Sequence, residues 1–166
     1  MREDPPPAGL TLRETAPADE PFLRNLYRST REPELALTNW SDEQKRAFCD
    51  QQFDFQDRWY RSQNPDARFL VIERDGAPIG RLYLRETESE VGVMDIALVP
   101  EARNAGLGTA LMEWVKTGAS ARNAAVTLHV EVFNPARALY ARLGFREVST
   151  QGMHILMRWE FVPGTN

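Results

Sequence analysis

The chain has 166 residues, of which 42% are hydrophobic and 27% charged, and its formal net charge is −4. This length and composition are typical of one globular domain, and the longest apolar runs fall far short of the roughly 18 residues that a membrane helix needs. The acidic balance argues against a general nucleic-acid binder, and the single cysteine, Cys49, excludes an internal disulfide and a multi-cysteine zinc site.

The first elements follow a short proline-rich stretch. Residues 1–8 contain three consecutive prolines and no apolar segment, which predicts a disordered lead rather than a secretory signal and places a single domain over residues 9–162. The domain opens with a strand over residues 10–13 and a helix that starts near residues 17–21. Ser41 and Gln44 have the spacing of a capping box, which predicts a second helix ending near Gln63.

The second predicted helix carries aromatic and acidic side chains that each have two explanations. Its aspartates form a solvated face or help to attract a cationic acceptor; they are Asp50, Asp54 and Asp57. Its aromatic residues pack in the core or line an apolar substrate pocket; they are Phe48, Phe53, Phe55, Trp59 and Tyr60.

From residue 68 onward the pattern changes to short apolar runs separated by turns. Runs over residues 69–72, 79–84 and 91–99 predict three antiparallel strands, with Asp75-Gly76 as the first hairpin turn. Helical spacing then begins near Gly108, and a strand over 126–132 and a short helix over 134–143 follow. A strand, a helix and a strand in this length predict a right-handed βαβ crossover and therefore a mixed sheet in an α+β domain.

The loop over residues 103–108, Arg-Asn-Ala-Gly-Leu-Gly, lies between a predicted strand and a predicted helix. Its glycines allow backbone N–H groups to converge at a helix N-terminus, an arrangement suited to a pyrophosphate, although glycines at helix starts are also common for structural reasons. A P-loop is excluded because Gly108-Thr109 lacks the motif's lysine. A dinucleotide site is the weaker alternative, because Leu111 stands where its third small residue is required.

Two segments together carry a family resemblance. Residues 95–108, Asp-Ile-Ala-Leu-Val-Pro-Glu-Ala-Arg-Asn-Ala-Gly-Leu-Gly, resemble motif A of the GNAT acetyltransferases, whose core is Gln/Arg-x-x-Gly-x-Gly/Ala. Residues 134–145, Asn-Pro-Ala-Arg-Ala-Leu-Tyr-Ala-Arg-Leu-Gly-Phe, resemble their motif B. The resemblance covers roughly residues 91–147 and implies a GNAT-like mixed central sheet, an antiparallel meander followed by the βαβ unit, and helices on both faces.

The resemblance also implies a binding site for acetyl-CoA. The strand over 93–99 is expected to carry a bulge and to splay from the strand over 126–132. The pantetheine arm would then pair with the backbone of Ile96 and Leu98. The pyrophosphate would bind the backbone amides of the loop residues, which are Arg103, Asn104, Ala105, Gly106, Leu107, Gly108 and Thr109. Asn134 is explained by helix capping, with a polar contact to the cofactor compatible with that role.

Proton transfer is assigned to two residues, each weighed against other interpretations. Tyr140 either packs in the core or, as the family position implies, protonates the departing CoA thiolate. Glu131 is the first candidate for the base that deprotonates the amine. The ribosomal-protein acetyltransferases of this superfamily carry a Glu on the similar strand, and the matching position here is His129, which is the second candidate; Asp95 and Glu90 are weaker ones. His129 and His154 are more typical of surface or structural histidines.

The sequence as a whole predicts a cytoplasmic enzyme without a metal. Because Cys49 lies among aromatic residues of a helix, it is interpreted as a buried hydrophobe, which favours direct transfer in a ternary complex over an acyl-cysteine intermediate. The predicted reaction moves an acetyl group from acetyl-CoA to a primary amine. A non-catalytic acyl-CoA-binding module and a plain interaction domain are the alternatives. A homodimer stays open, and the sequence does not identify the amine.

Overall fold

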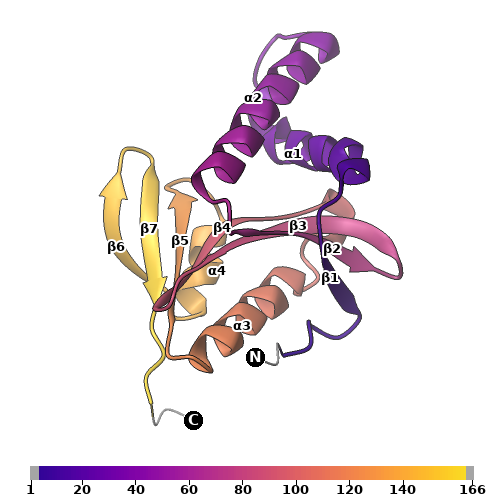
Figure 1. Ribbon diagram of the computed structural model, residues 1–166. Helices are drawn as coiled ribbons and strands as arrows, with labels where there is room; N and C mark the ends of the chain where they lie inside the picture. The colour runs from indigo at the N-terminus through magenta and orange to yellow at the C-terminus, as the bar shows by residue number, and fades with distance from the viewer. Residues whose placement is uncertain (1–3, 164–166) are drawn as a thin grey trace.

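The computed structural model describes residues 4–163, which form a central sheet with helices packed on it (Figure 1). The strands are β1 (Leu10–Glu14), β2 (Arg68–Arg74), β3 (Ala77–Glu86), β4 (Glu90–Leu98), β5 (Ala125–Glu131), β6 (Arg146–Gln151) and β7 (His154–Trp159). The α-helices are α1 (Glu20–Leu35), α2 (Asp42–Gln63), α3 (Leu107–Ser120) and α4 (Ala136–Arg142), and single 3-10 turns, Pro17–Asp19 and Pro100–Ala102, precede α1 and follow β4.

The sheet has seven strands in the order β1-β2-β3-β4-β5-β7-β6. Neighbouring strands are antiparallel, apart from the parallel pair β4–β5 that the crossover through α3 joins. Helices α1 and α2 lie on one face of the sheet and α3 and α4 on the other (Figure 1). The predicted α+β fold, with a mixed sheet between helices on both faces, is therefore confirmed.

Local signals in the sequence produce the expected turns and caps. The Ser41 hydroxyl accepts a hydrogen bond from the Gln44 amide at 3.2 Å, and the Gln44 side chain accepts one from the Ser41 amide at 2.9 Å, which completes the capping box of α2. Asp75 and Gly76 both have positive φ, 54° and 77°, which is the backbone of a two-residue hairpin turn between β2 and β3.

The C-terminal hairpin β6–β7 is absent from the sequence-based expectations. All six residues of β6 are exposed, so this edge strand lacks the apolar alternation that marks a half-buried strand. At the other end of the chain, residues 1–3 of the predicted lead lie outside the described residues. The carbonyl of Asp4, within the same lead, accepts a hydrogen bond from the Trp114 indole at 3.0 Å. The domain bounds themselves stay a prediction.

Two apolar cores lie on opposite faces of the sheet. The larger core joins the sheet to α3 and α4, and includes Leu82, Leu111, Val126 and Tyr140. The smaller core lies between α1 and α2; its buried residues are Leu23, Tyr27, Leu35, Cys49 and Phe53. Each pair of helices therefore has its own apolar core, and β4 lies in the sheet between the two helical layers.

Gly80 of β3 lies against the backbone of β4, which gives a first prediction. A Cβ at this position would overlap the carbonyl oxygen of Ala97 in β4. We expect Gly80→Ala to lower the free energy of unfolding by about 1–3 kcal/mol in urea denaturation, because β4 must shift. Gly118→Ala in α3, where a Cβ meets nothing within 4 Å, should instead raise it by roughly 0.5–1 kcal/mol. Equal stability of the two variants would contradict the close approach.

Candidate active site

Strands β4 and β5 are paired over only part of their length. Their parallel register runs from Glu90 opposite Ala125 to Val93 opposite Leu128. Beyond this point β4 stays with β3, whereas β5 continues along β7 up to Glu131. A register shift places Met94 as an extra residue in β4, so the strand bulges where it parts from β5. The expected bulge and divergence are both present.

The edge of β4 that faces away from β3 carries the peptide groups named from the sequence. The Val99 amide donates to the Ile79 carbonyl at 2.8 Å, so Val99 faces β3. Because peptide groups alternate along a strand, those of Ile96 and Leu98 face the opposite edge, toward β5. The Leu98 carbonyl there accepts a hydrogen bond from Arg103 Nε at 2.9 Å. This edge has no strand partner beyond Val93.

The loop that follows β4 presents a run of unpaired backbone amides. Within the described chain, no amide of residues 104–109 donates a hydrogen bond. Asn104 and Gly106 have φ values of 61° and 79°, and Gly106 is the N-cap of α3 without a side-chain cap. Successive amides in such a turn at a helix N-terminus form an anion-binding concavity. Arg103 fixes the loop, because its Nη2 also donates to the Ser29 hydroxyl of α1 at 3.1 Å.

Asn134 caps α4. Its side-chain oxygen accepts a hydrogen bond from the Ala136 amide at 2.9 Å, and its carbonyl accepts one from the Arg137 amide at 3.0 Å. Gly144, with φ of 92°, follows the last turn of the helix. The Asn134 side chain thus bonds the first helical amide as expected, although α4 begins at Ala136 with Pro135 at its N-cap, one residue later than predicted. A contact of Asn134 with a cofactor stays a prediction.

Tyr140 is buried on α4, 8% exposed, with its ring centroid 6.0 Å from that of Phe145. Its hydroxyl has no hydrogen-bond partner among residues 4–163. Burial raises the pKa of Tyr140 to about 12, and the negative charge of Asp95 acts on this pKa in the same direction. The phenol of Tyr140 therefore stays protonated at neutral pH. Because no described residue accepts its proton, the hydroxyl is free to donate a hydrogen bond to a bound molecule.

Asp95 is held by a buried arginine that the sequence analysis missed. Arg81 in β3 is 3% exposed; it forms an ion pair with Asp95 and donates to Gln56 Oε1 of α2 at 2.8 Å. Arg81 Nε is buried without a partner within residues 4–163. The sequence does carry a signal for Arg81, which is the lone charged residue inside the apolar run 79–84. A charge buried in such a strand requires a counter-ion, so a partner carboxylate could have been expected.

Asp95 and Tyr140 come from opposite faces of the sheet. Arg81 and Asp95 lie on the α2 side, as their contact with Gln56 shows, whereas Tyr140 belongs to the core under α3 and α4. The negative charge of Asp95 nevertheless raises the pKa of Tyr140. The Tyr60 hydroxyl of α2 donates to the Met94 carbonyl at 3.3 Å and so ties α2 to the bulge. The bulge region is thus held both by α2 and by the neighbouring strand β3.

Glu131 and His129 lie at the end of β5 on its exposed side. The buried residues between and before them, Leu128 and Val130, face the larger core, so both candidates face the α2 side. Glu131 stands directly opposite His154 of β7 in the strand register. Asp95, and not Glu131, is the carboxylate whose charge affects the pKa of Tyr140. The role of Glu131 as the base stays a prediction.

The remaining candidates lie elsewhere. Cys49 is 1% exposed in the core between α1 and α2, and burial raises the pKa of its thiol. Among the described residues, no cluster of histidine, cysteine or carboxylate side chains has the arrangement of a metal site. Across residues 4–163, no helix combines the length and the apolar character that a membrane span requires.

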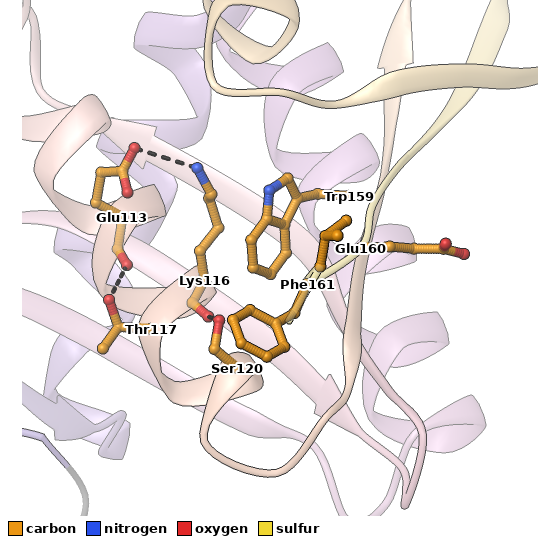
Figure 2. Close-up of a pocket in the computed structure, with 8 residues that line it drawn as sticks. Glu113, Lys116, Thr117, Ser120, Trp159, Glu160 and Phe161 are labelled. Atoms are coloured by element: carbon orange, nitrogen blue, oxygen red, sulfur yellow. Dashed lines mark hydrogen bonds and ion pairs between the residues drawn. The ribbon is translucent and has the colours of Figure 1, made fainter. Parts of the chain in front are cut away.

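A separate pocket of about 380 Å³ lies between α3 and the segment after β7 (Figure 2). Lys116 lies across its wall, with its ammonium 5.0 Å from the Trp159 ring and donating to the Leu143 carbonyl at 2.8 Å. Thr117 and Ser120 donate to carbonyls of α3 itself. The polar groups of this pocket are thus engaged with the protein, and it includes neither the 104–109 amides nor Tyr140.

Comparison with known proteins agrees with this geometry. A family model described as "Acetyltransferase (GNAT) family" matches residues 23–145, which is more than half of the chain. The chain belongs to the GNAT acetyltransferase family. No curated protein matches this family member closely enough to indicate a relative.

Solved structures share the fold at low sequence identity. The PaiA N-acetyltransferase from Thermoplasma acidophilum, in complex with coenzyme A, has a TM-score of 0.70 at 20% identity, covering 92% of this chain and 99% of that one. An acetyltransferase from Thermus thermophilus has a TM-score of 0.67 at 19% identity, covering 92% and 97%. Arabidopsis thaliana Naa50 with the bisubstrate analogue CoA-Ac-MVNAL has a TM-score of 0.60 at 14% identity, covering 93% and 100%.

Proposed function

We propose that this GNAT member transfers the acetyl group of acetyl-CoA to a primary amine by direct attack in a ternary complex. The observation that carries the proposal is the run of unpaired amides over 104–109, placed directly after a strand edge that has lost its partner. The edge at Ile96 and Leu98 suits the amides of pantetheine, and the loop suits its pyrophosphate. The coenzyme A and bisubstrate complexes of the similar folds support this choice of acyl donor.

The chemistry needs two proton transfers. The amine nitrogen attacks the thioester carbonyl carbon, and a C–N bond forms. As the tetrahedral intermediate collapses, the C–S bond breaks and the sulfur leaves with the electron pair. Tyr140 supplies a proton to that sulfur, and a carboxylate accepts the proton that the amine nitrogen loses. The products are an N-acetyl amine and CoA, and no covalent enzyme intermediate is required.

Asp95 is the carboxylate that we favour as the proton acceptor, and Glu131 is the alternative. Asp95 is 21% exposed in its side chain, and its charge raises the pKa of Tyr140, which supports its choice as the partner of that phenol. Glu131 is exposed and forms no ion pair with any residue of 4–163, so it suits contact with the ammonium form of the amine before its proton is lost.

Substituting the two carboxylates separates their roles. Asp95→Asn should lower kcat by at least about tenfold, whereas Glu131→Gln should mainly raise the KM of the amine. Steady-state kinetics over a range of pH measures both, and thermal melts control for the Arg81 charge that Asp95→Asn leaves uncompensated. If kcat falls only in Glu131→Gln, the general base is Glu131 and not Asp95.

Initial-rate kinetics test the function and its direct mechanism together. With both substrates varied, the reciprocal plots should intersect, as a ternary complex requires, and Cys49→Ser should keep the pattern. Parallel lines together with an acetylated Cys49 would contradict direct transfer. Stabilisation by acetyl-CoA without turnover of any amine would favour the non-catalytic binding module instead.

A further inference from the structure

The aromatic residues of α2 have different surroundings. Phe48 and Phe53 pack in the smaller core between α1 and α2, whereas Phe55 and Trp59 are 61% and 60% exposed. Tyr60, in the last turn of α2, is half-buried and reaches β4 through its hydrogen bond to the Met94 carbonyl. Tyr60 therefore belongs to the surroundings of the candidate active site.

Tyr60 contacts both strands at the bulge. Its ring lies edge-on against the ring of Tyr83 in β3, with centroids 6.1 Å apart and an interplanar angle of 86°. Tyr83 stands opposite Asp95, at the point where the register of β3 and β4 shifts. The Tyr60 hydroxyl donates to Met94, the extra residue of the bulge, at 3.3 Å. One side chain of α2 thus joins the two strands directly beyond Val93, where β4 parts from β5.

The bulge creates the need for this hydrogen bond. The register passes from Val93 opposite Leu84 to Asp95 opposite Tyr83, and Met94 has no opposite residue in β3. The extra residue of a bulge is left out of the ladder, and a carbonyl without a donor is unfavourable inside a protein. Burial raises the pKa of Tyr60 to about 12, with the charge of Asp95 acting in the same direction, so the hydroxyl is a donor at neutral pH.

We propose that Tyr60 is a positioning residue for the acyl donor. By bonding the Met94 carbonyl, it stabilises the bulge that turns β4 away from β5, and so keeps the edge at Ile96 and Leu98 open to pantetheine. The inference rests on that part of the proposed function which places pantetheine on this edge. Without the hydroxyl, the chain adopts the open edge for a smaller fraction of the time, and the apparent Kd of acetyl-CoA rises by that fraction.

Tyr60→Phe tests this role, because it removes the hydroxyl and keeps the ring against Tyr83. A typical hydrogen bond contributes enough to stability for its loss to raise the Kd of acetyl-CoA about three- to tenfold in isothermal titration. With an amine that the parent acetylates, the KM of acetyl-CoA should rise by a similar factor, whereas kcat and the KM of the amine stay near the parental values. A purely structural defect would instead lower the concentration of folded enzyme and leave both KM values unchanged.

Tyr27→Phe is the matched control. Tyr27 of α1 is 7% exposed in the smaller core, and its hydroxyl accepts a hydrogen bond from Arg31 Nη1 at 2.9 Å. Both variants lose one bonded phenol oxygen, so each should lower the Tm by about 2–4 °C. Only Tyr60→Phe should raise the Kd of acetyl-CoA.

The outcomes separate this inference from the proposed function. A parental Kd in Tyr60→Phe, or an equal rise of Kd in both variants, would overturn the inference and leave the transferase proposal standing. A parent protein that does not bind acetyl-CoA would overturn both. If the parent binds acetyl-CoA and acetylates no amine, the transferase proposal fails, and the Kd of Tyr60→Phe still decides the role of Tyr60.

Discussion

Tyr140→Phe should lower kcat by about 10² to 10³ while acetyl-CoA binds as tightly as to the parent protein. Tyr140 is the proposed acid, and the thiolate charge that it would neutralise develops only in the transition state. Phenylalanine keeps the ring and its contact with Phe145. Because the hydroxyl has no partner among the described residues, its removal leaves no other group unpaired, and the stability should hardly change.

Tyr83→Phe is the matched control for this substitution. The Tyr83 hydroxyl is also without a described partner, so both variants lose a phenol oxygen and keep the ring, although the Tyr83 ring lies against Arg81 and the Tyr140 ring against Phe145. Only Tyr140→Phe should affect kcat.

The Tyr140 pKa of about 12 also predicts how kcat depends on pH, since the phenol loses its proton only as the pH rises through the folded-state pKa. The parental kcat should therefore lose nothing to Tyr140 ionisation below about pH 11. If Tyr140→Phe turns over at the parental rate while the chemical step is rate-limiting, Tyr140 is not the general acid and only packs in the core.

Gly106→Val should raise the Kd of acetyl-CoA by about a hundredfold. Gly106 has φ of 79°, a conformation that a β-branched residue rarely adopts, so the loop must leave it and its amides turn away from a common point. Hydrogen bonds to charged groups contribute about 1.5–3 kcal/mol each, so the loss of two accounts for the expected change. A Cβ at Gly106 meets nothing within 4 Å, so a larger side chain would not clash with the protein. The constraint at this position is therefore the backbone conformation.

Gly76→Val separates strain from binding. Gly76 has φ of 77° and equally open surroundings, but it lies in the β2–β3 turn. Both valine variants should lose about 1–3 kcal/mol of stability, and only Gly106→Val should lose affinity for acetyl-CoA in isothermal titration. If a folded Gly106→Val protein binds acetyl-CoA like the parent, the 104–109 amides are not the pyrophosphate site.

Features that depend on neighbouring residues were predictable from the sequence. The capping box at Ser41, the Asp75-Gly76 turn and the start of α3 after Gly106 are each decided within a few positions, so their residue types suffice. The divergence of β4 and β5 followed from the family resemblance of residues 95–108. The β6–β7 hairpin did not, because its outer strand is exposed along its whole length and has no apolar alternation.

Features that depend on strand register were not predictable. Arg81 and Asp95 meet because β3 and β4 are antiparallel with a bulge at Met94, and one residue of slip would place them on opposite faces. The effect of Asp95 on the pKa of Tyr140 likewise joins residues that lie far apart in the sequence. The pairing of Asp95 with Arg81 is therefore visible only in the folded chain, which is why Asp95 is a weak candidate for the base in the sequence.

The central claim is that an amine takes the acetyl group of acetyl-CoA at the divergence of β4 and β5. Its most direct test is to incubate the protein with acetyl-CoA and each member of a panel of primary amines, and to quantify CoA and the acetylated amine in the same sample by mass spectrometry. We expect CoA and the acetylated amine to form in equal amounts. Their rate of formation should be far above that without protein and strongly reduced in Tyr140→Phe. CoA release without the acetylated amine, or neither product although acetyl-CoA raises the Tm, would contradict it.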